Sequence, residues 1–178
     1  MNASSRRKRI YLTIFVFTGA FLLLAIGASI PIDHQTATTL VNQLNETVTQ
    51  NQQSGTLPQY IFLNNFRICL AFFIPIFGPA FGFVSFLSTG YYIGAESQVL
   101  GFPPLLYVVA EFLNPIFWIE FISYSIAIAE SLWLFRRLMQ KRFKEIKSRE
   151  LKNLGILIGI CAALLVVGAI IESMLPLI

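Results

Sequence analysis

The chain has little charge, few cysteines and one histidine, and these scarcities exclude several protein classes. Charged residues make up 12% of its 178 residues, about half the roughly 25% of an average soluble domain. Its two cysteines, Cys69 and Cys161, lie in apolar segments, where each is expected to be a small buried hydrophobe rather than part of a disulfide framework. The histidine, His34, has no Cys-x-x-Cys motif to join, so we expect neither a dedicated zinc nor a copper site.

The sequence also lacks a catalytic constellation. One histidine in a polar stretch cannot complete a Ser/His/Asp set, and no phosphate-binding loop is present. The carboxylates of the apolar segments have neither a nucleophile nor a metal ligand set beside them. No base-stacking motif accompanies the basic residues, so a nucleic-acid partner is not expected. We predict that the protein is not an enzyme and carries no cofactor.

Long apolar runs dominate the rest of the chain, which is 56% hydrophobic. A membrane-spanning helix needs roughly 20 mostly apolar residues. The run from Ile10 to Ile30 exceeds the roughly 7–15 residues of a signal-peptide core, so we expect an uncleaved first span. The fold class predicted is an all-α, polytopic helical bundle forming one membrane domain over 1–178. Its predicted spans are about 10–31, 60–77, 79–98, 105–135 and 153–175.

The distribution of Lys and Arg predicts the orientation of these spans. Of the 13 such residues, all but Arg67 lie in 6–9 or 136–152. Short loops rich in Lys and Arg stay cytoplasmic. Both basic segments are therefore predicted to be cytoplasmic, with an even number of crossings between them. We expect a multi-pass protein of the cell membrane with its N-terminus cytoplasmic and its C-terminus external.

Two extramembrane segments follow from that orientation. The polar stretch 32–59 becomes an external loop, in which Asn45 begins a possible glycosylation sequon. The basic linker 136–152 becomes cytoplasmic and is expected to contact anionic lipids. Apolar residues at Met139, Phe143 and Ile146 favour an amphipathic surface helix there. A solvated continuation of the fourth span fits the linker equally well.

Glycine and proline mark two irregular places among the spans. Gly78-Pro79 is an uncharged helix-breaking pair, so we predict a broken or re-entrant element there, with protein covering its unbonded backbone groups. The segment 105–135 is too long for one straight span. We predict a short outer piece ending at Asn114, a break at Pro115, and then the true span.

Three pairs of glycines, each four residues apart, put small surfaces on single helical faces. Such faces let helices approach closely in lipid. The pairs can serve packing within this chain or an interface with a partner, and the sequence leaves both readings open. They are Gly78 and Gly82, Gly90 and Gly94, and Gly155 and Gly159.

Polar side chains within the predicted spans gather at one depth, in the outer half of the membrane. Charged groups there are costly and mark either function or essential pairing. Three readings stay open: an ion pair between Arg67 and Glu120, a cation or proton site, or a partner-binding surface. Glu130 lies near the inner end, where Arg136 or Arg137 can pair with it. The predicted cluster consists of Asn64, Asn65, Arg67, Glu96, Glu111, Asn114, Glu120 and Glu172.

Several stretches resemble the stage II sporulation protein M family over about residues 61–175. The segment Ile61-Phe-Leu-Asn-Asn-Phe-Arg67 resembles the Asn-Asn pair that opens a span in that family. The Gly78–Gly82 turn, Ser88-Thr-Gly90 and the ending Gly168-Ala-Ile-Ile-Glu172 also resemble it. Pro115-Ile-Phe-Trp-Ile-Glu120 stands where the family has a His-Gly-x-x-Glu core; it keeps the Glu but lacks the His and Gly.

The resemblance implies a non-catalytic membrane scaffold, because the family's bacterial founders act as scaffolds with a cell-wall-degrading partner during spore engulfment. Its archaeal relatives lack a clear role. The resemblance points to Asn64, Asn65, Glu120 and Glu172 as the positions that correspond to functional positions of the family. We predict a scaffold or accessory subunit bound to other membrane proteins, as a hetero- or homo-oligomer. One specific version is a subunit of a large membrane enzyme complex such as an archaeal ammonia-oxidising monooxygenase. The alternative is a small transporter or channel that uses the outer carboxylates.

Overall fold

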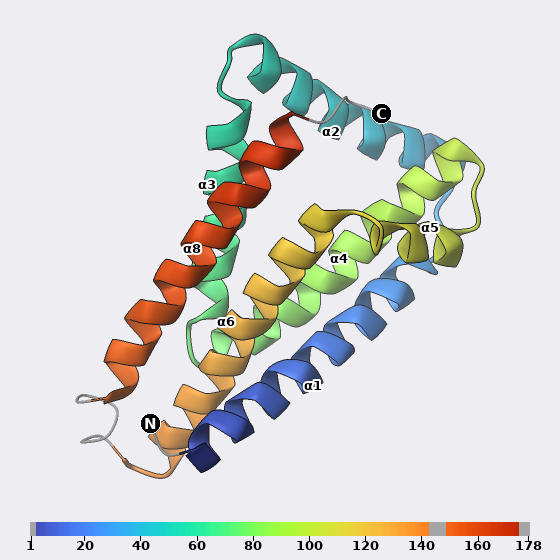
Figure 1. Cartoon of the computed structure of the whole chain (residues 1–178). Helices are drawn as coiled ribbons and strands as arrows, with labels where there is room; N and C mark the ends of the chain where they lie inside the picture. The colour runs from blue at the N-terminus through green and yellow to red at the C-terminus, as the bar shows by residue number, and fades with distance from the viewer. Residues whose placement is uncertain (1–2, 143–148, 175–178) are drawn as a thin grey trace.

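The computed structural model describes residues 3–142 and 149–174, and these form seven helices and no strand (Figure 1). The predicted all-α class is confirmed. The long helices lie alongside one another, while α2 crosses one end of the bundle (Figure 1). The helices are α1 (Ala3–Ala28), α2 (His34–Gln53), α3 (Leu57–Phe72), α4 (Phe77–Leu100), α5 (Pro104–Glu111), α6 (Pro115–Met139) and α8 (Leu151–Ser173).

Helices α1 and α4 pack against one another through glycines, with their backbones in close contact. A Cβ atom added at Gly90 would lie 2.1 Å from the carbonyl oxygen of Leu24, and one at Gly94 would lie 2.7 Å from that of Ala28. Gly27 of α1 faces α4 in the same way, 2.1 Å from the carbonyl oxygen of Leu87. Only glycine allows this approach. The Gly90–Gly94 face therefore serves packing within the chain.

The other two glycine pairs differ from one another. An added Cβ at Gly78 would lie 2.0 Å from the carbonyl oxygen of Phe72, and one at Gly82 would lie 2.5 Å from Ile128 Cδ1. That pair therefore also packs within the chain, against the end of α3 and against α6. Gly155 and Gly159 of α8 have no described atom within 4 Å of an added Cβ. Their face is open.

The break between α3 and α4 lies before Gly78-Pro79, not at it as predicted. The helices are separated by residues 73–76, where Ile76 has a φ of 71°. Pro79 sits in the first turn of α4, where its missing N–H costs no helical hydrogen bond. Pro75 instead falls in the break. The Ser131 hydroxyl of α6 donates to the Ile74 carbonyl oxygen at 2.8 Å, which satisfies a backbone group exposed by the break.

Residues 34–53 form the helix α2, whereas the sequence predicted only an external loop over 32–59, whose external location stays a prediction. Asp33 caps the helix, because its side chain accepts the Thr36 N–H at 2.9 Å. The buried Ala37 anchors one face against the bundle. Gln, Asn and Thr side chains cover the opposite face, and this polarity suggested a loop. Asn45 is exposed on this helix, so its sequon does not lie in a loop.

The predicted break at Pro115 is confirmed. Helix α5 ends at Glu111, and α6 begins at Pro115. Asn114 caps α6, since its side-chain oxygen accepts the Ile116 N–H at 3.0 Å. Proline suits the first helical position because its fixed φ is already helical and its N–H is not needed.

The described residues contain three helices long and apolar enough to cross a membrane, or four if the bent pair α4 and α5 forms one span. The three are α1 from Arg6, α6 and α8, and the bend between α4 and α5 is 114°. The predicted five spans are not confirmed. Helix α3 has 16 residues, which reach about 24 Å and fall short of a ~30 Å apolar core.

The described parts of both basic segments lie at one end of the bundle, and α8 ends at the other, near α2 (Figure 1). The Arg9 side chain contacts Glu130, in the second half of α6, and Glu150, the residue before α8. The first part of the linker, 136–139, continues α6. The predicted surface helix falls mostly on 143–148, which lie outside the described residues, as does residue 175 at the end of the predicted last span.

Candidate functional site

The structure gathers most of the predicted outer cluster around Glu120 of α6. The Asn65 side-chain amide of α3 donates a hydrogen bond to Glu120 Oε1. Asn64 donates to Asn65 at 3.5 Å, which makes it a marginal contact. Glu172 of α8 and Glu111 of α5 lie close enough to Glu120 to interact with it electrostatically. Four helices therefore bring polar side chains to one place.

The cluster extends from Glu111 toward the end of α4. Glu96 interacts electrostatically with Glu111 and lies within hydrogen-bonding reach of the Tyr107 hydroxyl. Asn114, which caps α6, lies within reach of Glu111. Tyr107 was not predicted as a member; its position three residues after Pro104 on a short apolar helix offered no signal. All predicted members except Arg67 are connected in this way.

Arg67 does not pair with Glu120, so that reading of the sequence is wrong. Its side chain is exposed, and the described residues give it no ion pair. The reason is rotation about the helix: Arg67 lies two residues after Asn65, about 200° around α3. Asn65 faces Glu120, and Arg67 therefore faces away. Matching depth in the membrane did not determine which side of the helix each residue occupies.

The outer cluster thus consists of carboxylates and amides with no paired cation in the described part of the chain. Oxygen ligands of this kind suit hard cations in general. No group of three His, Cys, Asp or Glu side chains within residues 3–142 and 149–174 is arranged to hold a metal ion. The arrangement offers amide donors and acidic oxygens for a polar partner group.

A second charged cluster, at the opposite end of the bundle, was missed from the sequence. The Arg9 guanidinium of α1 donates to Glu130 of α6 and to Glu150, the residue before α8. Both glutamates are 3% exposed. The predicted partners of Glu130 were Arg136 and Arg137. The orientation argument predicted that 6–9 and 136–152 lie on the same side of the membrane, and that common side could have suggested a basic residue of 6–9 as a partner.

Trp133 stands at the centre of this second cluster. The Arg9 guanidinium carbon lies 5.0 Å from the ring centroid, and that of Arg137 lies 4.8 Å from it. The indole N–H donates to Glu150 Oε1 at 3.3 Å, and Arg137 Nε lies 3.5 Å from the same oxygen. Guanidinium groups are attracted to the faces of aromatic rings. The cluster therefore ties the starts of α1 and α8 to the end of α6.

The comparisons with known proteins agree with the sequence resemblance. The model of the family described as stage II sporulation protein M matches residues 11–175. The match begins within α1 and so reaches beyond the stretch of about 61–175 that carried the resemblance. No curated protein and no solved structure matches the chain. With α1, α6 and α8 as membrane-crossing candidates and this match over most of its length, the chain belongs to the stage II sporulation protein M family of membrane proteins.

Proposed function

We propose that the chain is a non-catalytic scaffold or accessory subunit that binds another membrane protein along an exposed face of α3. Arg67 carries this proposal. It lies ten residues after Leu57, about 15 Å along the helix axis. If α3 begins at the membrane surface, the charge lies near the middle of the ~30 Å apolar core.

The exposed face of α3 is a continuous stripe. Its members recur at intervals of three and four residues, the spacing of one helical face. It combines three large apolar side chains with two polar ones at membrane depth. We define the α3 stripe as Tyr60, Leu63, Asn64, Arg67 and Leu70.

A charge on such a face favours an acidic partner. Arg at the centre of a membrane helix costs about 2.5–3.5 kcal/mol on insertion scales. A carboxylate from a partner helix at the same depth would offset that cost, and the neighbouring Asn64 would add a hydrogen bond. The open glycine face at Gly155 and Gly159 offers a second surface where a helix can pack closely.

The topology that fits this proposal has three complete crossings, by α1, α6 and α8. Helices α3 and α4 then form a re-entrant hairpin that turns at residues 73–76 inside the membrane. The positive-inside rule places the basic end in the cytoplasm, with the N-terminus there and the C-terminus external. Of these three crossings, α1 and α6 lie between the two basic segments. Their number is even, so both basic segments remain on the same side of the membrane. Five crossings by the same helices would also keep both segments on that side.

The proposal is tested by gentle purification from native membranes followed by mass spectrometry of the proteins that accompany the chain. We expect partners at constant stoichiometry with the wild type. We expect these partners to be lost with Arg67→Leu, which replaces the charged side chain with an apolar one. Arg67→Lys retains the charge and is the matched control. A large enzyme complex, such as an archaeal ammonia-oxidising monooxygenase, would be recognised by its subunits.

A wild-type protein that arrives alone would contradict the proposal, and so would partners that remain bound to Arg67→Leu. The thermal unfolding of both variants in detergent should match that of the wild type, because Arg67 is exposed and makes no ion pair among the described residues. This check separates loss of a partner from loss of the fold.

The convergence of the outer carboxylates favours a second candidate function, a small transporter or channel. Glu120, with which Glu111 and Glu172 interact electrostatically, would take up the transported proton or attract the transported cation. This function predicts ion flux in liposomes that is lost in Glu120→Gln. Absence of flux with the wild-type protein would reject it.

A further inference from the structure

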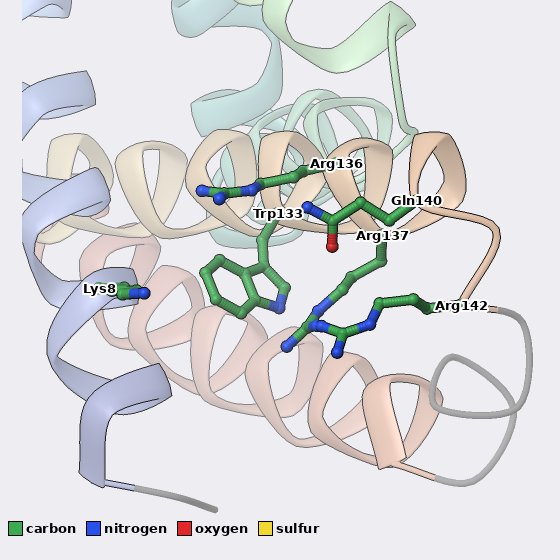
Figure 2. A pocket seen from close by; sticks show the side chains of 6 residues that line it. All are labelled: Lys8, Trp133, Arg136, Arg137, Gln140 and Arg142. Atoms are coloured by element: carbon green, nitrogen blue, oxygen red, sulfur yellow. The ribbon is translucent and has the colours of Figure 1, made fainter.

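A basic hollow opens at the end of the bundle where α1 begins and α6 ends (Figure 2). It encloses about 180 Å³. Among the described residues, four cationic side chains line it and no carboxylate does. We define the basic hollow by its lining residues: Lys8, Trp133, Arg136, Arg137, Gln140 and Arg142.

The two nearby carboxylates, Glu130 and Glu150, both bind Arg9, which is not a lining residue. Glu130 accepts from Arg9, and Glu150 accepts from Arg9 and from the Trp133 indole. Glu150 also interacts with Arg137. Glu130 and Glu150 are not among the lining residues, although Glu150 contacts two residues that are, Trp133 and Arg137. The lining therefore keeps an excess of positive charge, with Lys8 and Arg136 both exposed.

Trp133 gives the hollow a fixed wall. The residue is 6% exposed, its N–H is bonded to Glu150, and the Arg137 guanidinium lies over its ring. Figure 2 shows the Lys8 ammonium on one side of the indole ring and Arg137 and Arg142 on the other. The Arg137 guanidinium is already held over this ring, so it loses less side-chain freedom on binding a compact anion than a free surface cation does.

The chemistry and place of the hollow point to a phosphate group. Guanidinium groups present several N–H donors in a plane that matches phosphate oxygens, and Lys adds a point charge. The hollow lies where α1 and α6, both candidate spans, leave the apolar region at their basic ends. Lipid headgroups occupy this level. We propose that the basic hollow binds a phosphate-bearing anion, supplied either by an anionic lipid headgroup or by a small soluble phosphate compound.

Native mass spectrometry of the full chain in a neutral detergent tests this site. The probes are phosphatidylglycerol, zwitterionic phosphatidylcholine, glycerol 3-phosphate and inorganic phosphate. We expect the anionic phosphate probes to bind more tightly than phosphatidylcholine. Lys8→Gln combined with Arg136→Gln should weaken that binding about tenfold or more, as expected for lost hydrogen bonds to charged groups.

The matched control is Arg6→Gln with Lys152→Gln. It removes the same two charges from exposed positions that do not line the hollow, so its binding should remain close to wild type. Phosphatidylglycerol binding that requires the hollow identifies a lipid headgroup as the source. Binding of glycerol 3-phosphate or inorganic phosphate without phosphatidylglycerol identifies a soluble compound. Equal losses in the two double variants, or no preference for the anionic phosphate probes, would overturn the proposal.

Discussion

The carboxylates at the two ends of the helix bundle have different partners. At the basic end, one guanidinium, that of Arg9, joins two buried carboxylates, Glu130 and Glu150. At the other end, Glu120 accepts a hydrogen bond from a neutral amide and has further carboxylates beside it. The cation of that region, Arg67, is exposed on the far side of its helix.

The difference distinguishes charges that stabilise the fold from charges that are available to a binding partner. A buried ion pair is costly to form, but removing one partner of it is strongly destabilising. A charge left uncompensated at membrane depth has no such structural role and marks a functional surface. The basic end should therefore be sensitive to single substitutions in its stability, and Arg67 should be sensitive only in its binding.

Arg9→Gln should give the largest loss of stability. The change leaves Glu130 and Glu150, both 3% exposed, without the cation that joins them, and losses of this kind reach about 3–5 kcal/mol. Chemical or thermal unfolding in detergent measures it. Arg7→Gln removes the same charge from an exposed neighbour and should have little effect. Equal losses in both variants would mean that Arg9 acts only through overall charge.

The two ends of the bundle can also be compared with two glycine faces, one closely packed at Gly90 and one open at Gly159. Gly90→Ala places a Cβ 2.1 Å from the Leu24 carbonyl oxygen, so α1 and α4 must separate, at a cost of about 1–3 kcal/mol. Gly159→Ala meets no described atom within 4 Å and should be neutral or stabilising, because alanine favours helices over glycine by about 0.8–1.0 kcal/mol. The same unfolding assay compares them, and similar losses would contradict the packing described here.

Substitutions of Glu120 test the role of its contact with Asn65, at the end of the bundle where the described carboxylates have no paired cation. Glu120→Ala leaves the partly buried Asn65 amide without its acceptor, which costs about 1 kcal/mol, the low end of the range for a fully buried group. Glu120→Gln keeps an acceptor oxygen and removes one of several like charges, so we expect almost no loss. A large loss in Glu120→Gln would show that the negative charge itself holds α3 against α6.

Asp33 should give the smallest effect. The Thr36 hydroxyl and N–H hold the pKa of Asp33 below its ordinary value of 3.8. A lowered pKa in the folded state means that the cap stabilises α2 above pH ~4 and that this contribution is lost as the pH falls through the folded-state pKa. Hydrogen exchange at the start of α2 should therefore quicken at low pH in the wild type. Asp33→Asn, which keeps an acceptor, should remove that pH dependence.

Part of this arrangement could be predicted from the sequence, because it depends on which residue types occur at which positions along the chain. The distribution of Lys and Arg predicted that 6–9 and 136–152 lie on the same side of the membrane, and Arg9 does contact Glu150. Pro115 after a capping Asn marked the start of α6. In these cases a local chemical preference determines the result.

The rest required information on rotation and packing. Depth placed Arg67 level with Glu120, but the direction of a side chain around α3 depends on which face packs against α6 and α8. The polar residues of 34–53 suggested a loop because only a few apolar residues, among them Ala37, anchor the helix. Pro79 resembled a break, yet proline is accommodated in a first turn. Tertiary contacts decided each of these.

A photo-crosslinking residue at position 63 tests the central claim most directly. Leu63 is 45% exposed on the α3 stripe, and Leu22 of α1 is 57% exposed and serves as the control position. Illumination in native membranes should give a protein crosslink of defined mass from position 63, lost when Arg67→Leu is added, and no such product from position 22. Mass spectrometry of the product identifies the partner, a second copy of the chain included. No protein product from position 63, or the same product from both positions, would contradict the account.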